Sequence, residues 1–361
     1  MFETIASIIK ICFIVVCLLL PMAFLLMWAE RKESAIMQDR IGANRASVFG
    51  IRAWGLISMM ADAIKMFVKE DFSPPFANKR LFHFAPFLAM FAVLITFAVI
   101  PFGPEWTLLG HTVKLQIADL GVGFLYMFAL APLGIYAIAL GAWASNNKYS
   151  ALGGIRAVGQ LISYEVVVGL SLIGLVMVFG TVQLDSIVVQ QGDYWFNGWI
   201  PKWGVFLQPL GLLLFFPAGF AETKRVPFDL PEGESEIIGF NLEYSGLKFG
   251  LFMMSEFIEM VILGALLTTF FFGGWQVPWL FSDGFHFPWG WDFSLPHTAV
   301  VLLQVMSFLT KLVFFGWFLQ IVRWTLPRFR YDQLIRLCWL YLLPLAVLNV
   351  VITGIVILVL Q

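Results

Sequence analysis

The sequence predicts an all-α polytopic membrane protein, a chain whose helices cross the bilayer several times. Of its 361 residues, 60% are hydrophobic and only 12% are charged, which is about half the roughly 25% charge of soluble domains. Apolar stretches near the roughly 20 residues that a transmembrane helix needs recur along the whole chain. Most charged residues lie in the connections between these stretches. These observations favour a single helical membrane domain, 1–361.

Eight stretches are long and apolar enough to cross a membrane: residues 5–29, 82–102, 119–143, 155–180, 205–221, 248–272, 298–324 and 334–360. The first has neither a basic segment before it nor a small-residue cleavage site after it, so we expect a retained span rather than a signal peptide. Residues 275–296 are rich in Trp, Phe, Gly and Pro and lack Lys and Arg. That composition is typical of an aromatic loop at the membrane interface.

Residues 50–68 lie between the first and second spans and are apolar on one side. Arg52, Asp62 and Lys65 interrupt the apolar pattern. We therefore expect an amphipathic helix that lies on the membrane surface rather than crossing it.

The distribution of Lys and Arg predicts which connections face the cytoplasm. Connections 30–81, 144–156, 222–248 and 323–336 hold 18 of the 22 Lys and Arg residues. Because cytoplasmic loops carry an excess of these residues, we expect all four connections on the cytoplasmic side. With eight spans, both termini then lie on the periplasmic side of the inner (plasma) membrane.

The composition argues against several classes of function. The net charge of −1 and the absence of a basic arm give no reason to expect nucleic acid as a partner. Cys12, Cys17 and Cys338 lie in apolar stretches without a CxxC pair. We expect buried thiols there, and neither a zinc nor an iron–sulfur site. The sequence also has no nucleotide-binding glycine motif and no Ser–His–Asp pattern. Taken together, these absences predict no metal, no bound cofactor and no catalytic residue in this chain.

The connection 222–247 is the most informative polar segment, reading ETKRVPFDLPEGESEIIGFNLEYSGL. Its acids lie between two apolar spans, and carboxylates are costly near hydrocarbon, so the cluster indicates a functional site. Its two prolines favour a loop of fixed shape over a flexible tether. A solvated acidic loop is the alternative. The acids are Glu222, Asp229, Glu232, Glu234, Glu236 and Glu243.

Charged residues also lie inside the predicted spans, namely Glu165, Glu256, Glu259 and Lys311. A proton path requires carboxyl groups that gain and lose protons near neutral pH, and Glu165 and Glu256 could continue such a path inward from the loop. Glu259 shares a helix face with Glu256, but a neutral carboxyl in a helix–helix hydrogen bond explains it equally well. Lys311 could supply a countercharge or a further relay member.

A basic cluster of Arg31, Lys32, Arg40 and Arg45 lies at the cytoplasmic end of the first span. Taken singly, each residue suits an anchor on the positively charged side of the membrane. Together with the amphipathic helix and the acidic loop, they could wall a chamber that opens towards lipid. Such a chamber would suit an amphipathic ligand with an apolar tail and a polar head.

Eight motifs follow one another along nearly the whole chain. They are AERK (29–32), RIGANR (40–45), ADAIKMFVKE (61–70), GAWASNNKYSALGGIRAVGQLISYE (141–165), ETKRVPFDLPEGESE (222–236), GFNLEYSG (239–246), FFGGW (271–275) and LPRFRYDQL (326–334). Through them the chain strongly resembles the membrane subunit designated H in bacterial NADH:quinone oxidoreductase (respiratory complex I), which is called NADH dehydrogenase subunit 1 in mitochondria.

The resemblance implies a membrane subunit that contains no redox centre, anchors the peripheral arm and forms most of the membrane part of the quinone chamber. The quinone-chamber residues of the family carry over to Arg31, Asp62, Lys65, Arg225, Phe228 and Asp229. The proton or coupling path carries over to Glu165, Glu222, Glu232, Glu234, Glu236, Glu243 and Glu256. Iron–sulfur clusters and flavin are implied on partner subunits. The implied partners are the peripheral quinone-site and iron–sulfur subunits, neighbouring small membrane subunits, quinone and lipid.

Two positions depart from the family pattern. Ala43 stands where the family has the proline of a GPN turn, so we expect a looser turn. Glu259 matches no acid of the family, so we expect Glu259→Gln to be nearly silent. Two other functions stay open: the homologous membrane subunit of a membrane-bound hydrogenase or ferredoxin-dependent complex, and an independent secondary ion carrier. The intact EGESE and EYSG segments favour the quinone enzyme.

Overall fold

The structure, a computed structural model, describes residues 2–108, 111–195, 198–233 and 236–360. Among these residues, seven helical segments are long and apolar enough to cross a membrane: Ile8–Met37, Lys79–Phe97, Gly123–Ala144, Lys148–Phe179, Gly246–Phe271, His297–Thr325 and Tyr331–Leu360. The helix Pro209–Glu222 is also apolar but has only 14 residues. The predicted helical, polytopic membrane fold is confirmed at this level.

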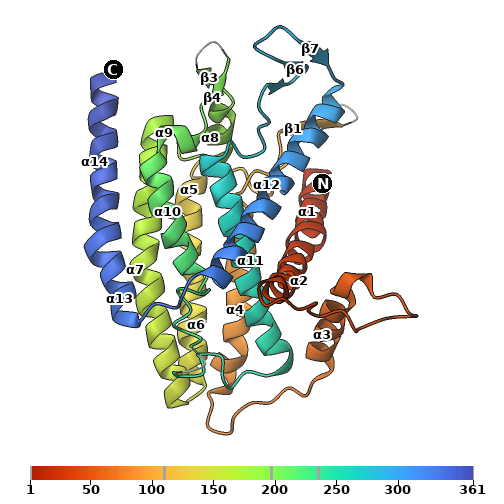
Figure 1. Ribbon diagram of the computed structural model, residues 1–361, viewed down its shortest axis with the longest axis vertical. Coiled ribbons are helices and arrows are strands. Elements are labelled where there is room, and N and C mark those ends of the chain that lie inside the picture. Colours follow the sequence, from red (N-terminus) through yellow and green to blue (C-terminus); the bar gives the residue numbers. More distant parts are fainter. Residues whose placement is uncertain (1, 109–110, 196–197, 234–235, 361) are drawn as a thin grey trace.

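The helices form one elongated bundle (Figure 1). They are α1 (Phe2–Phe13), α2 (Leu20–Met37), α3 (Leu56–Val68), α4 (Lys79–Phe97), α5 (Gly123–Leu130), α6 (Leu133–Ala144), α7 (Lys148–Phe179), α8 (Leu184–Gln191), α9 (Gly204–Leu207), α10 (Pro209–Glu222), α11 (Gly246–Phe271), α12 (His297–Thr325), α13 (Tyr331–Arg336) and α14 (Leu343–Leu360). The π-helical turns Ile14–Leu19 and Leu337–Leu342 join α1 to α2 and α13 to α14. Both chain ends lie in the upper half of Figure 1, whereas the connection between α10 and α11 lies in the lower half.

Each expected span overlaps one of these helical segments, but the helices begin and end at their own signals. The segment expected at 119–143 is broken between α5 and α6 at Pro132, because proline lacks an N–H and clashes with the preceding turn. The helix expected at 155–180 begins earlier, since the Asn147 side chain caps α7 by accepting from the backbone N–H of Tyr149 at 2.9 Å. It ends at Gly180, which adopts φ 65°.

Helix α3 occupies the last 13 residues of the predicted amphipathic segment 50–68. It follows a 3₁₀ turn (Ala53–Gly55) whose Gly55 has φ 94°, and a Cβ there would lie 2.1 Å from the carbonyl oxygen of Ala43. Only glycine fits so close to another backbone segment. Met59 is buried, whereas Met60 and Phe67 are exposed. The helix therefore carries an exposed apolar side.

Short antiparallel strands lie at the upper end of the bundle in Figure 1. They pair as β1 (Glu105–Leu108) with β2 (His111–Lys114), β3 (Tyr194–Trp195) with β4 (Ile200–Pro201), and β5 (Leu280–Phe281) with β6 (Gly284–His286) and β7 (Asp292–Ser294). The segment expected to be an aromatic loop, 275–296, thus contains a three-stranded sheet. The Trp289 ring packs against Trp279 and Phe287, with centroids 5.8 and 4.8 Å away.

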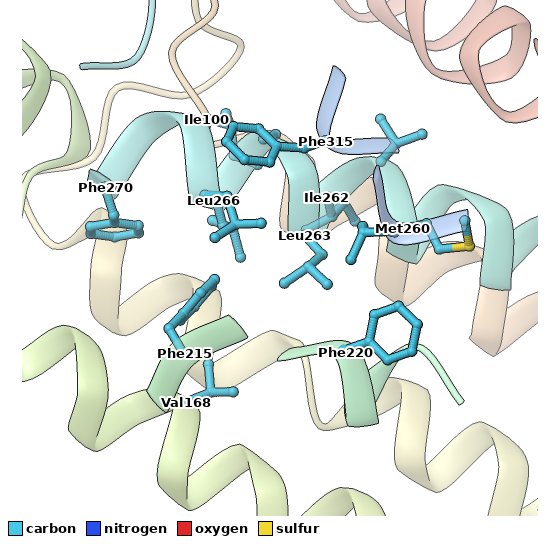
Figure 2. Close-up of a cluster of buried hydrophobic side chains, with 14 of the residues drawn as sticks. Ile100, Val168, Phe215, Phe220, Met260, Ile262, Leu263, Leu266, Phe270 and Phe315 are labelled. Carbon is cyan, nitrogen blue, oxygen red and sulfur yellow. The ribbon is translucent and has the colours of Figure 1, made fainter. Parts of the chain in front are cut away.

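The core centres on α11, the most deeply buried of the long helices. Figure 2 shows Leu263 and Leu266 of α11 on the side that faces Phe215 of α10, while Phe315 lies on the other side of the helix. A Cβ at Gly219 of α10 would lie 2.4 Å from the Leu263 side chain. Glycine therefore allows these two helices to approach closely, as small residues do in membrane bundles.

The expectation of three buried cysteines is wrong for two of them. Cys338 is buried, but Cys12 and Cys17 are exposed on the outside of the first helical segment. An apolar sequence in a membrane helix does not distinguish a face that packs on protein from one that faces lipid.

Candidate functional site

The connection between α10 and α11 is folded into the bundle instead of extending away from it. Lys224 and Phe228 are buried, and α7 holds the turn in place. The side-chain amide of Gln160 donates hydrogen bonds to the carbonyl oxygens of Ala221 and Phe228, both at 2.8 Å. The first half of the connection therefore has a fixed path along α7.

A second set of contacts holds the far half of the connection. Ser150 of α7 donates a hydrogen bond to the carbonyl oxygen of Phe240 at 2.6 Å. A Cβ at Gly153 would lie 2.8 Å from the backbone nitrogen of Phe240. The two backbones approach so closely that a side chain at this position would displace the loop.

Phe228, a predicted quinone-chamber residue, lies among other aromatic rings. Its ring centroid is 5.7 Å from that of Tyr164, 6.0 Å from Phe220 and 5.4 Å from Phe329. The side chain packs beneath the loop and fixes the position of the next residue, Asp229.

Arg225, the second predicted chamber residue of the loop, joins three elements. Its guanidinium lies 3.4 Å from a carboxylate oxygen of Glu30 in α2 and 3.7 Å from one of Glu256 in α11. It also stacks over the Phe257 ring at 4.4 Å. A buried cation needs such partners, because its desolvation is otherwise very costly. Glu30 pairs in addition with Arg323 of α12, so the network connects α2, the loop, α11 and α12.

Asp229 lies beside this network and pairs with Arg328, which follows α12, at 2.7 Å. Burial raises the pKa of Asp229 from about 3.8 to about 6, although Arg328 and Arg323 oppose the shift. The carboxyl group can therefore exchange a proton near neutral pH.

The remaining predicted chamber residues gather at the junction of α2 and α3. Arg31 forms an ion pair with Asp62 at 2.7 Å, and Lys65 reaches the other oxygen of Asp62 at 3.1 Å. Burial alone would raise the pKa of Asp62, but the hydrogen bonds from Arg31 and Lys65 outweigh it and lower this pKa. The Arg31 and Asp62 side chains stay 38% and 24% exposed, so their charges are accessible.

Two predicted path acids, Glu232 of the loop and Glu256 of α11, lie close enough for each carboxyl group to act on the protonation of the other. Two ionised carboxylates near each other repel, which favours a proton on one of them. Burial raises the pKa of Glu232, while Arg225 opposes the shift. Asn241 donates to Glu232 at 2.9 Å and fixes its orientation. The pair is suited to hold one shared proton.

Glu165 and Glu222, two further path acids, line a cavity of about 110 Å³. One water molecule needs roughly 10–15 Å³ of such volume, so the cavity has room for several. Most of its wall is apolar, and Ala131 and Gly134 line it where α5 and α6 are interrupted. Interrupted helices are tolerated at membrane depth where they border protein or a water-filled cavity.

The same cavity contains an ion pair that the sequence did not predict. Lys224 and Glu259 both line it, and their charged atoms are 2.6 Å apart. Glu259 matches no acid of the family, yet it lines the same cavity as the path acids Glu165 and Glu222. Its spacing from Glu256 was a usable signal, but its partner Lys224 lies on another element.

The other predicted path residues belong to the second half of the loop. Glu236 pairs with Arg156 of α7 at 2.5 Å, and Glu243 accepts a hydrogen bond from Asn147 at 2.6 Å. Both contacts tie the loop to the start of α7. Glu234 lies outside the described residues.

Lys311, considered as a countercharge, bonds to the backbone instead. Its ammonium group donates to the carbonyl oxygens of Phe272, Gly274 and Gln276 at 2.9, 2.9 and 2.7 Å. These contacts use all three ammonium protons and satisfy carbonyl groups at and after the end of α11. Lys311 therefore caps the carbonyl groups at the end of α11, and its role as a countercharge or relay member stays a prediction.

Comparison with known proteins agrees with this geometry. The family model described as NADH dehydrogenase matches residues 9–354. The relatives that follow are NADH-quinone oxidoreductase subunits that carry the designation H. The chain is 44% identical to such a subunit of Cytophaga hutchinsonii over 91% of its own length and 90% of that protein. It is 45% identical to one of Geobacter metallireducens, covering 93% and 92%, and 39% identical to one of Rhizobium meliloti, covering 95% and 94%.

These matches span almost the whole chain and almost the whole of each relative. The chain therefore belongs to the NADH dehydrogenase family, as one of the H-designated membrane subunits of NADH-quinone oxidoreductase, the respiratory complex I.

Proposed function

We propose that this chain forms the membrane wall of a quinone chamber and couples quinone reduction there to proton translocation through buried carboxyl groups. Membership of this family of complex I membrane subunits supports both parts. The observation that carries the proposal is the position of Arg225. This residue contacts Glu30, next to the chamber residue Arg31, and also Glu256 of the acid series.

The chamber end of the site suits an amphipathic ligand. Arg31 of α2 and Asp62 of α3 present accessible charges, and α3 also presents exposed apolar side chains such as Ile64. A quinone has a polar head that accepts hydrogen bonds and an apolar tail. Lys65, Arg225, Phe228 and Asp229 complete the proposed chamber, with Phe228 holding Asp229 in place.

The coupling step starts from the chemistry of quinone. Reduction of a quinone to a quinol consumes two electrons and two protons, and the electrons come from an iron–sulfur cluster of a peripheral partner. Negative charge on the reduced quinone, or loss of a proton from Asp229, changes the field at Arg225. Because Arg225 balances both Glu30 and Glu256, that change alters where the proton of the Glu232–Glu256 pair resides.

Protons continue inward from this pair to the cavity that Glu222 and Glu165 line. Water in the cavity would bridge carboxyl groups that do not touch. Glu236 and Glu243, which are tied to the start of α7, and Glu234 complete the coupling series on the loop. The contacts of Glu236 with Arg156 and of Glu243 with Asn147 would transmit movement of the loop to α7.

The proposed topology counts α10 as the eighth span. The connections rich in Lys and Arg support a chamber on the cytoplasmic side of the inner membrane, with both termini on the periplasmic side. Helix α3 then lies along the membrane surface with its apolar side in lipid.

The cytoplasmic connections 30–81 and 222–248 are the proposed docking surface for the peripheral quinone-site and iron–sulfur subunits. Flavin and iron–sulfur clusters belong to those partners. Neighbouring small membrane subunits and lipid would contact the sides of the bundle. The chain itself carries out no redox step.

Chamber variants test the proposal in the assembled complex. Arg31→Ala and Asp229→Ala should impair quinone reduction while leaving NADH oxidation by a soluble artificial acceptor nearly intact. Arg31→Lys should also be impaired, because lysine copies the planar donor fork of arginine poorly. Equal loss of both activities would show failed assembly and would contradict a specific chamber role.

Two alternatives predict other outcomes. A membrane subunit of the hydrogenase type would co-purify with a hydrogenase large subunit, whereas the proposed function requires an NADH-binding subunit. The names of the relatives favour the NADH-binding partner. An independent carrier would move ions when the chain alone is placed in liposomes. We expect no such transport.

A further inference from the structure

The Lys224–Glu259 ion pair is the feature of the cavity that the proposed path leaves unused. Lys224 follows α10 and is only 3% exposed, and Glu259 in the middle of α11 is 24% exposed. Their charged atoms are 2.6 Å apart. Both side chains line the same cavity as Glu222 and Glu165. An ion pair in this place acts on every carboxyl group that shares the cavity.

The charges of the cavity lining do not balance. Three carboxyl groups, Glu165, Glu222 and Glu259, share it with one cation, Lys224. In a poorly solvated space a cation strongly favours the ionised form of the carboxyl group nearest to it. The acid that holds Lys224 is therefore the most readily ionised of the three, and the other two bind protons more readily.

We propose that Glu259 is a positioning residue of the proton path, which holds Lys224 away from Glu222 and so leaves Glu222 and Glu165 able to take up protons. The inference rests on the proposed function, since it assumes that the cavity acids carry protons. When Glu259 becomes protonated, Lys224 is released towards Glu222. Uptake of a proton by Glu259 therefore favours release of a proton from Glu222.

The surroundings of Glu259 allow this role. Glu222 of α10 and Glu165 of α7 share its cavity, and Glu256 lies one turn earlier on α11. Arg225 and Glu232 of the loop act on the pair from farther away. The helices α4, α5 and α6 contribute only uncharged residues to the cavity lining.

Helix α6 meets the Glu259 side chain at a glycine. At Gly134 a Cβ would lie 3.8 Å from a carboxylate oxygen of Glu259. Gly134 itself therefore adds no side-chain atom beside this carboxyl group, whereas the Cβ of an alanine there would be in van der Waals contact with it.

The test uses the assembled complex with the variants Glu259→Gln, Lys224→Gln and the double variant. Quinone reductase turnover and proton pumping are measured in proteoliposomes across pH. In Glu259→Gln, Lys224 is left to pair with Glu222 and should favour its ionised form. The part of the pH profile in which activity falls with rising pH should therefore move by about one pH unit to lower pH. At a fixed pH in that part of the profile, activity should be roughly tenfold lower. Lys224→Gln should move that part of the profile to higher pH. The double variant should return close to the original profile.

A purely structural ion pair gives a different result. It would lower assembly or thermal stability in the single variants but leave the pH profile of the assembled complexes unchanged, and that outcome would overturn the inference. Asp193→Asn is the matched control. It removes the 3.3 Å pair with Lys202, which lies outside the cavity, and should leave the profile in place.

Two further variants separate the remaining outcomes. If Glu259→Gln does not assemble, Glu259→Asp keeps the charge but shortens its reach, so a smaller shift to lower pH is expected and an unchanged profile overturns the inference. Glu165→Gln tests the proposed function itself. Normal pumping by Glu165→Gln would reject the path, whereas lost pumping with unshifted Glu259 and Lys224 variants would reject only the role of Glu259.

Discussion

Replacement of Gln160 by Leu should loosen the loop that carries the chamber residues. The Gln160 side chain is fully buried and donates to the carbonyl oxygens of Ala221 and Phe228, both at 2.8 Å. Leu has a similar volume but leaves both acceptors without this donor. A buried acceptor left unsatisfied costs about 1–3 kcal/mol, and the Ala221 oxygen keeps a 3.4 Å contact with the Lys224 backbone. We therefore expect a local loss of about 2–4 kcal/mol.

Hydrogen–deuterium exchange of the purified complex measures this loss. A change of about 2–4 kcal/mol raises the population of locally open loop about 30- to 900-fold, so peptides from 222–233 should exchange faster while those from α11 stay protected. Quinone reductase activity should fall in parallel, because Asp229 loses its fixed position. Gln116→Leu is the matched control. It removes a buried amide contact with the Val99 carbonyl, at 2.5 Å, between α4 and α5, and should leave loop exchange and quinone activity unchanged. Unchanged exchange in Gln160→Leu would refute the claim that the two Gln160 hydrogen bonds hold the loop in place.

Three further predictions concern titration, capping and docking. The pKa of Asp229 near 6 implies a carboxylic-acid infrared band that disappears as pH rises from about 5 to 7. Asp229→Asn should lack this band. Disappearance of the band entirely below about pH 4.5 would contradict the raised pKa. Lys311→Met removes three hydrogen bonds at the end of α11 and should lower the midpoint of thermal unfolding, with little change in the quinone concentration for half-maximal rate. Connections 30–81 and 222–248 should be shielded from protease in the complete complex and accessible in membranes that lack the peripheral arm; equal accessibility would refute a docking role.

Much of the fold was predictable because membrane helices follow directly from the length and polarity of apolar stretches. Their ends were harder to place. Pro132 divides a continuous apolar stretch into α5 and α6, and the Asn147 cap starts α7 earlier than hydropathy indicates. The strands near Trp279 pair in a segment that also makes aromatic contacts, and composition reveals neither the pairing nor the contacts. The exposure of Cys12 and Cys17 depends on helix packing in the same way.

The candidate site shows a similar division. Motifs and charge placement indicated the acids and the basic cluster, because charges near hydrocarbon are rare and costly. They did not indicate pairs between distant elements. Glu30 lies in the AERK motif, yet only the fold brings it between Arg225 and Arg323. Lys224 and Glu259 are likewise separated in the sequence by the whole loop, and the bundle brings them together.

The most direct test of the central claim is proton pumping by complexes that carry Glu165→Gln or Glu256→Gln, measured in proteoliposomes with assembly checked separately. Gln keeps the size and hydrogen bonding of Glu but cannot release a proton. If the buried carboxyl groups couple quinone reduction to proton movement, pumping and quinone reductase turnover fall together in both variants, and the Glu→Asp variants are milder. Normal pumping by the assembled Glu165→Gln and Glu256→Gln complexes would contradict the account and leave both acids with a role in helix packing alone.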